Sequence, residues 1–173
     1  MNTNIFKHVS VRGRVAYGIC CLESAINYYN LKHLDWSSLL HILWSYTNEN
    51  VGRWHEIMAE SSPDSILEDL SYFQKGNTNI SMEQYNYLIN IYKHSNKVIH
   101  FIINTITDIW TYDLYSSIVN NSPQTLAYLS EIISLMEQEN IPLPAVESFL
   151  QFSIQENGGW GRAFTREEIF NQS

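Results

Sequence analysis

Cysteine, proline and glycine are all scarce in this sequence of 173 residues, which has two cysteines, four prolines and seven glycines. Long helices tolerate neither proline nor glycine in their interiors, so this scarcity favours a helical chain. Cys20 and Cys21 are adjacent, and neighbouring side chains on a helix point to different sides, which does not suit a disulfide. A chain of this length buries enough surface to fold without disulfides or a structural metal.

Long uncharged apolar runs are also missing. A membrane-spanning helix needs roughly 20 such residues, and the most apolar stretch, residues 98–114, contains His100, Asp108 and Asp113. Residues 1–11 lack the apolar segment of a secretory signal. We therefore expect no membrane contact, and a reducing, cytoplasmic setting.

Recognisable catalytic and cofactor motifs are absent from the sequence. His55-Glu56 begins like a zinc-protease helix, but Ala59 stands where the second histidine is needed. There is no Cys-x-x-Cys pair, no nucleophile elbow and no P-loop lysine near the glycines at 158–161. Glu56 and Glu60 share a helix face, which is more typical of a solvated surface than of an acid–base pair. We expect a protein without enzymatic activity, cofactor or metal.

Apolar residues recur at helical spacing through most of the chain. Helices are expected over about 10–29, 36–46, 51–60, 63–76, 82–92, 98–110, 123–136, 144–150 and from 166 onward. Ser10, Asp35, Ser62, Ser81 and Ser122 are the expected N-caps, and Ser81 and Thr165 each open a capping box.

Two of these segments carry further expectations about packing. Gly13 and Gly18 in the first helix suggest a close neighbour. The isoleucine-rich run at 98–110 resembles a strand locally, but it is long and lacks alternation, which favours a helix. Its apolarity predicts a central place in the core.

These elements predict an all-α fold, with residues 1–173 forming a single-domain helical bundle of about eight helices. A short α-solenoid of helix pairs is the alternative, although the sequence shows no repeated signature.

Charge is distributed unevenly along the chain. The net charge is −8, yet residues 98–161 contain no Lys or Arg and hold seven carboxylates, while the rest holds 11 acidic and 10 basic residues. Nucleic-acid binding needs clustered basic residues, and the local group of Lys7, Arg12 and Arg14 is more typical of a solubilising surface. Mild acidity can also serve solubility alone.

A segment with one sign of charge creates a field that steers oppositely charged partners, and buried aromatic side chains supply affinity. Trp110, Tyr112, Tyr115 and Tyr128 are candidate aromatic anchors near the carboxylates. The sequence therefore suggests a surface that binds a basic protein. Its candidate contact residues are Asp108, Tyr112, Asp113, Tyr115, Glu131, Glu137 and Glu139.

The segment Arg14-Val-Ala-Tyr-Gly-Ile-Cys-Cys-Leu-Glu23 resembles the pattern Arg-x-Ala…Cys-x-Glu in the amino-terminal helix of some small helical immunity proteins. Those proteins belong to contact-dependent growth inhibition and related polymorphic toxin systems of bacteria. The resemblance covers about ten residues. It implies a cytoplasmic protein that binds and neutralises a cognate toxin domain, often a basic nuclease, with the acidic segment mimicking nucleic-acid phosphate.

A different class of function stays open from the residues alone. An α-helical enzyme or small-molecule sensor would use a pocket between helices, with Arg14, Glu23 or the histidines as its polar groups.

Overall fold

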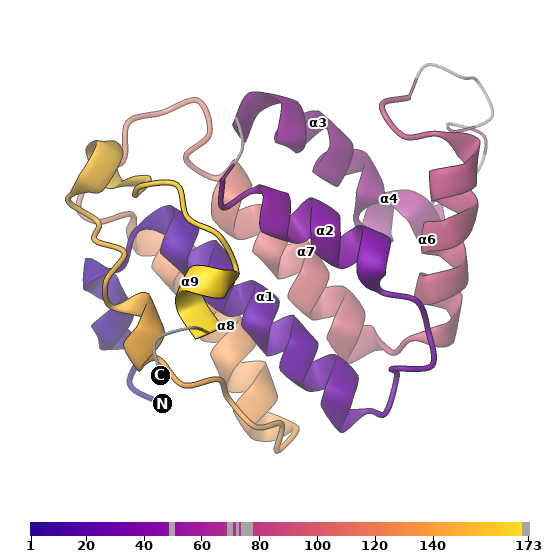
Figure 1. The fold of residues 1–173 in the computed structure, drawn as a ribbon, viewed down its shortest axis with the longest axis horizontal. Coiled ribbons are helices and arrows are strands. Elements are labelled where there is room, and N and C mark those ends of the chain that lie inside the picture. The colour runs from indigo at the N-terminus through magenta and orange to yellow at the C-terminus, as the bar shows by residue number, and fades with distance from the viewer. Residues whose placement is uncertain (49–50, 69–70, 72, 74–77, 171–173) are drawn as a thin grey trace.

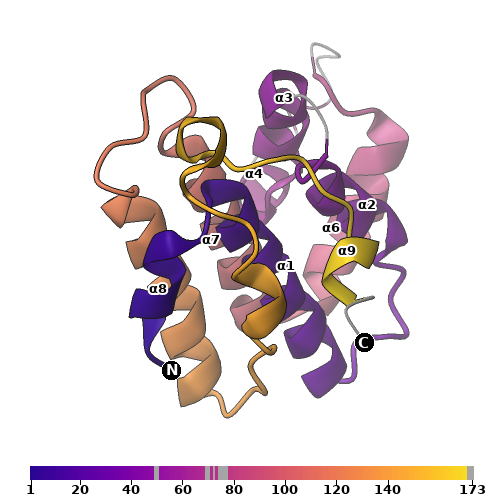
Figure 2. The same ribbon diagram turned by 60° about the vertical axis from the view of Figure 1, so that its left-hand side comes forward.

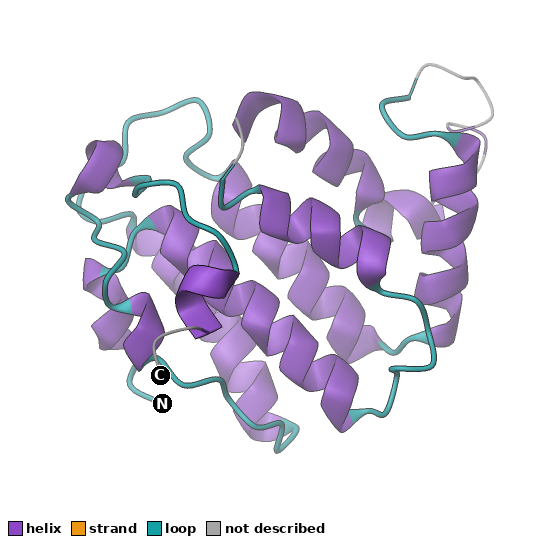
Figure 3. Cartoon of the chain, viewed as in Figure 1, coloured by secondary structure: helices purple, strands orange, loops and turns teal. Residues whose placement is uncertain are grey.

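A computed structural model describes residues 1–48, 51–68, 71, 73 and 78–170. The α-helices are α1 (Val11–Tyr28), α2 (Ser37–Ser45), α3 (Val51–Ser61), α4 (Pro63–Glu68), α6 (Met82–His94), α7 (Lys97–Thr111), α8 (Pro123–Gln138) and α9 (Glu167–Phe170). Three 3₁₀ helices are η1 (Thr3–His8), η2 (Glu147–Phe149) and η3 (Glu156–Gly159). Helices and the loops between them make up the described chain (Figure 3), which confirms the all-α prediction.

Helix α1 lies at the centre of the molecule, packed against α2, α7 and α8 (Figure 1). Every residue from 11 to 22 is buried. A Cβ on Gly18 would lie 3.0 Å from Ile106 Cγ1, and one on Gly13 would lie 2.6 Å from Val9 Cγ1. The expected close packing at both glycines is confirmed, because neighbouring side chains occupy the space that a larger residue would need.

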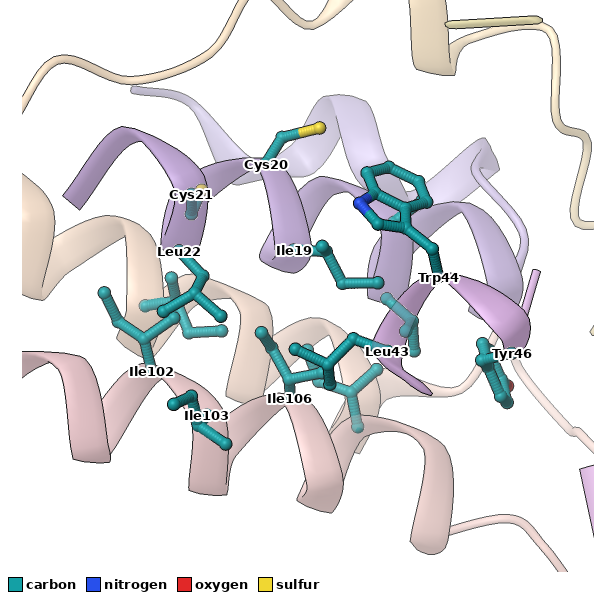
Figure 4. Close-up of a cluster of buried hydrophobic side chains, with 14 of the residues drawn as sticks. Ile19, Cys20, Cys21, Leu22, Leu43, Trp44, Tyr46, Ile102, Ile103 and Ile106 are labelled. Carbon is teal, nitrogen blue, oxygen red and sulfur yellow. The ribbon is translucent and has the colours of Figure 1, made fainter. Parts of the chain in front are cut away.

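The main contact between α1 and α7 is aliphatic. Ile19 and Leu22 of α1 face Ile102, Ile103 and Ile106 of α7 (Figure 4). The run at 98–110 is therefore a helix, as predicted. The prediction that this helix is central in the core is only partly confirmed, because α7 has an exposed face that includes Phe101 and Asp108.

The helices form a bundle and not a solenoid. In a solenoid each repeat contacts only its neighbours in sequence, whereas α1 packs most extensively on α7 and α8, which follow it by about 70 residues or more. The segment leading to α9 returns to lie beside α1 and α2 (Figure 2). One hydrophobic cluster includes residues from Phe6 to Ile169.

Several predicted helix starts are confirmed by their cap hydrogen bonds. Ser10 Oγ and Ser81 Oγ each accept the backbone N–H of the third following residue, at 3.2 and 3.1 Å. At the last predicted cap, the Thr165 N–H donates to Glu168 Oε1 at 3.0 Å. Local hydrogen bonding thus fixes these boundaries independently of tertiary packing.

The helix expected after Pro144 was a wrong prediction. Only the single 3₁₀ turn η2 forms there, and the carbonyl oxygens of Pro142 and Pro144 accept hydrogen bonds from the hydroxyls of Ser24 and Tyr17 of α1. Helix α4 covers Pro63–Glu68 of the helix expected over 63–76, and the stop expected at Gly76 lies outside the described residues.

Arg14 is completely buried, so its prediction as a solubilising residue was wrong. Its guanidinium donates to the carbonyl oxygens of Phe6 (3.1 Å), Asn121 (2.9 Å) and Ser122 (2.8 Å), and to Thr125 Oγ1 (2.7 Å). One side chain of α1 therefore joins η1, the loop before α8 and the first turn of α8.

The loop before α8 is shaped around this guanidinium. Residues 120–122 all have positive φ, which orients the carbonyls of Asn121 and Ser122 toward Arg14. Ser122 is the N-cap residue of α8, as predicted, but its side chain makes no cap hydrogen bond, because its hydroxyl donates to the buried carboxylate of Asp113. Burial lowers the pKa of Arg14 to about 10, and the nearby charge of Asp113 opposes that shift.

Arg12 is buried as well, with its guanidinium 5.3 Å from the centre of the Tyr46 ring. Of the three residues in the expected basic group, only Lys7 is exposed.

We predict that Arg14→Lys lowers the free energy of unfolding by about 3 kcal/mol, since an ammonium cannot reproduce the fork of hydrogen bonds and leaves buried carbonyls unpaired. Urea denaturation measures this change. Arg162→Lys is the matched control, because Arg162 is partly exposed and pairs with Glu168, and its effect should stay within about 0.5 kcal/mol. Equal losses in the two variants would contradict the structural role of Arg14.

Candidate functional site

The pairing of α7 with α8 brings acidic and tyrosine side chains together on the surface. On α7, Asn104, Asp108 and Tyr112 follow one another at intervals of four residues and share a face. Helix α4 adds Asp64, and α8 adds Tyr128 and Glu131. We call these residues the acidic stripe: Asp64, Asn104, Asp108, Tyr112, Tyr128 and Glu131.

Like charges meet at the middle of the acidic stripe. Partial burial and the nearby carboxylates of Glu131 and Asp64 raise the pKa of Asp108 above its ordinary value. Asn104 Nδ2 donates to Asp64 Oδ1 at 2.8 Å, which ties α4 to α7. None of the ion pairs within the described residues involves these three carboxylates. The stripe is therefore a negative surface without an internal cation.

Exposed tyrosines border the carboxylates. The rings of Tyr112 and Tyr128 pack edge to face at 6.3 Å between their centroids, and Tyr112 is 55% exposed. Tyr115 is 90% exposed and its ring lies 6.2 Å from His55. These rings offer apolar area at the surface, which is typical of contact sites.

Trp110 is not part of this surface, although the sequence suggested it as an anchor. It is fully buried, with its ring 4.7 Å from Trp54 and 4.6 Å from His55. Period-based reasoning placed it correctly on the apolar face of α7, and that position excludes contact with a partner.

The structure separates the seven contact residues that the sequence suggested. Asp108, Tyr112 and Glu131 lie in the acidic stripe. Asp113 is only 6% exposed and accepts a hydrogen bond from the Ser122 hydroxyl. It therefore supports the Arg14 network, and its prediction as a surface contact residue was wrong.

Glu137 and Glu139 lie near the carboxyl end of α8 and have partners of their own. The amino group of Met1 contacts Glu137. Tyr29 donates its hydroxyl to Glu139 at 3.0 Å, and burial together with this bond raises the pKa of Tyr29 to about 12. These two glutamates join the amino-terminal region to α8 and do not extend the acidic stripe.

Two stripe residues, Asp64 and Asn104, were not found from the sequence. Asn104 could have been recognised from its four-residue interval to Asp108, whereas Asp64 joins only because α4 packs on α7. Glu60 was expected on a solvated face, and this was wrong. It is 9% exposed and accepts the backbone N–H groups of Asn79 and Ile80 at 2.6 and 3.2 Å.

The groups considered for catalysis are dispersed or buried. Burial raises the pKa of both Cys20 and Cys21, which disfavours the reactive thiolate. His33 and His94 each lie within hydrogen-bonding distance of a backbone carbonyl of their own neighbourhood. Among the described residues, no three His, Cys, Asp or Glu side chains are placed to hold a metal ion.

A groove is formed by α1, α2 and residues 165–167 around the charged pair of Glu23 and Arg166. It consists of two cavities of about 460 and 470 Å³, and Glu23, Leu40 and Arg166 line both. We call it the Glu23 groove. The Glu23 carboxylate accepts a hydrogen bond from Trp44 Nε1–H at 3.1 Å and forms an ion pair with Arg166.

Comparison with known proteins identifies no relative. No family model, curated protein or solved structure matches this chain. The described helices include none long and apolar enough to cross a membrane.

We predict that Asp108→Asn stabilises the protein at neutral pH. A raised pKa in the folded state means that ionisation of Asp108 disfavours folding, so its contribution to stability falls as pH rises from about 3.8 through the folded pKa. Because Asp108 is exposed, the gain at pH 7 should be small, about 0.5 kcal/mol.

Thermal unfolding between pH 3 and pH 7 measures the effect. The difference between Asp108→Asn and the unmodified protein should grow with pH. Glu83→Gln, at an exposed carboxylate on α6, is the control and should show no such growth. A variant that is less stable than the unmodified protein at pH 7 would disprove repulsion within the stripe.

Proposed function

We propose that this protein binds a basic protein through the acidic stripe, and that the partner is a toxin domain which the protein neutralises as an immunity protein. The single observation that carries the proposal is that Asp108 lies near the carboxylates of Asp64 and Glu131, with no ion pair to any of the three among the described residues, and beside the exposed ring of Tyr112.

The electrostatic state of the stripe supports this proposal. Partial burial and then the nearby charges of Glu131 and Asp64 raise the pKa of Asp108, so its ionised form is disfavoured in the free protein. Lys or Arg side chains of a partner would favour that ionised form. A surface that reduces the stability of the free protein is typical of a functional site.

The tyrosines support it on different grounds. Charge complementarity mainly increases association rate and specificity, while aromatic side chains near the centre of an interface supply much of the affinity. Tyr112 and Tyr128 adjoin the carboxylates, so charge and apolar contact are available together. A nucleic-acid partner is disfavoured, since phosphate would meet the same negative surface.

The choice of a toxin as partner rests on the sequence. The resemblance of residues 14–23 to the amino-terminal helix of small helical immunity proteins supports it, as does the absence of a recognised catalytic motif. Placement in the cytoplasm is part of the same proposal, because an immunity protein of this kind acts where the toxin would act.

We predict that the complex with the cognate toxin domain forms through electrostatic steering. The proposal implies that the toxin is the variable carboxy-terminal domain of a large secreted protein encoded immediately upstream, and the test uses that domain in catalytically inactive form. The association rate is measured by stopped flow between about 50 and 500 mM NaCl. Over this range the Debye screening length shortens from roughly 15 Å, so long-range attraction between the two proteins weakens. The association rate should fall at least tenfold over this range.

Asp108→Asn with Glu131→Gln should slow association at low salt by about tenfold and flatten the salt dependence. Glu56→Gln with Glu83→Gln removes the same charge at exposed sites on α3 and α6, and should leave the rate within about twofold. Lack of binding, or the same loss in both double variants, would overturn the proposal.

A further inference from the structure

Arg166 divides the Glu23 groove into its two cavities. Its side chain lines both of them, together with Glu23 and Leu40. Arg166 Nε and Nη2 donate to Glu23 Oε1 and Oε2 at 3.3 and 3.2 Å. The ion pair of Arg166 and Glu23 thus borders both cavities.

The groups around the Arg166 guanidinium are those that bind arginine side chains in proteins. Glu23 accepts both arms of the fork, and Trp44 Nε1–H holds Oε1 of the same carboxylate at 3.1 Å. The Arg166 guanidinium lies 5.8 Å from the centre of the Trp44 ring and 4.7 Å from that of Phe170. A carboxylate that accepts a fork, combined with aromatic faces, selects arginine over lysine.

The receptor side of this arrangement is fixed, whereas the arginine is loosely held. Glu23 and Trp44 belong to α1 and α2 in the bundle, and the Glu23 side chain is 19% exposed. Arg166 precedes the four-residue helix α9, and its side chain is 47% exposed. Exposed ion pairs contribute little free energy, so another guanidinium can compete for Glu23.

The cavities on each side have the character of a peptide site. One is lined by apolar Ile26, Leu34 and Trp36 together with the polar side chains of Asn27, Lys32 and Asp35. The other includes the hydroxyls of Ser37, Ser45 and Thr47 and the side chain of His41. A chain entering the groove would therefore find both apolar contacts and hydrogen-bonding groups on either side of its arginine.

We propose that the Glu23 groove binds an arginine side chain of a partner protein, and that Arg166 occupies this site in the free protein and competes with the partner. The site goes beyond the function proposed above, because α1, α2 and α9 form it, whereas the acidic stripe lies on α4, α7 and α8. Charge complementarity selects the occupant, as Arg166 itself demonstrates the fit of a guanidinium to Glu23 and Trp44.

Competition within the chain makes a quantitative prediction. When a site is open for only a fraction of the time, the apparent dissociation constant is the intrinsic constant divided by that fraction. With Arg166 in place about nine-tenths of the time, its removal should strengthen binding of an external arginine about tenfold.

The test uses a blocked peptide with one central arginine between leucines, and the same peptide with citrulline, which keeps the shape and loses the charge. Binding is followed by the ¹H–¹⁵N signal of the Trp44 indole, assigned with Trp44→Phe. The arginine peptide should shift this signal and bind Arg166→Ala about tenfold more tightly than the unmodified protein. Arg166→Gln should repeat that gain, and the citrulline peptide should bind neither.

Two further variants separate recognition from general loosening of the segment. Glu23→Gln combined with Arg166→Ala should lose binding. Arg162→Ala removes the pair with Glu168 in the same segment but keeps Arg166, and should show no tenfold gain. Asp108→Asn should bind the peptide like the unmodified protein, which separates this site from the acidic stripe. An unshifted Trp44 signal in folded Arg166→Ala, or equal binding of the citrulline peptide, would overturn the proposal.

Discussion

The buried guanidinium of Arg14 is the constraint on which the rest of this structure depends. A cation without solvent is tolerated only where its hydrogen bonds are satisfied, and here the acceptors come from η1, from residues 121–122 and from the first turn of α8. Asp113 lies in the same network. The guanidinium therefore fixes where α8 begins relative to α1 and the end of α7, and this register places Asp108 near Glu131 and Tyr112 near Tyr128.

This arrangement gives the surface its uneven charge. The carboxylates of residues 98–161 do not act as one group, since Asp113 turns inward and Glu137 and Glu139 have partners near the amino-terminal region. The carboxylates that remain on the surface where α7 packs against α8 are those of the acidic stripe, to which α4 adds Asp64. The Glu23 groove differs in character, because its carboxylate already holds a guanidinium from the same chain.

Much of the fold could be predicted because its signals are local. Ser10 and Ser81 cap helices with their own side chains, and the spacing of Ile102, Ile103 and Ile106 marks a buried helix face. The candidate sites depend on contacts between distant segments. No residue near Arg14 in the sequence indicates that its guanidinium binds carbonyl oxygens more than 100 residues away. Asp64 joins the acidic stripe only because α4 packs on α7. Arg166 reaches Glu23 only because the segment before α9 packs on α1.

Amide chemical-shift mapping of the complex with the inactive toxin domain tests the central claim most directly. The largest changes should fall on residues 104–111 of α7, on its C-cap Tyr112 and on residues 124–134 of α8, with smaller ones around Asp64, and the pKa of Asp108 should fall when the partner binds. A footprint confined to η1, η2 and the carboxyl end of α8, with the pKa of Asp108 unchanged, would contradict the central claim.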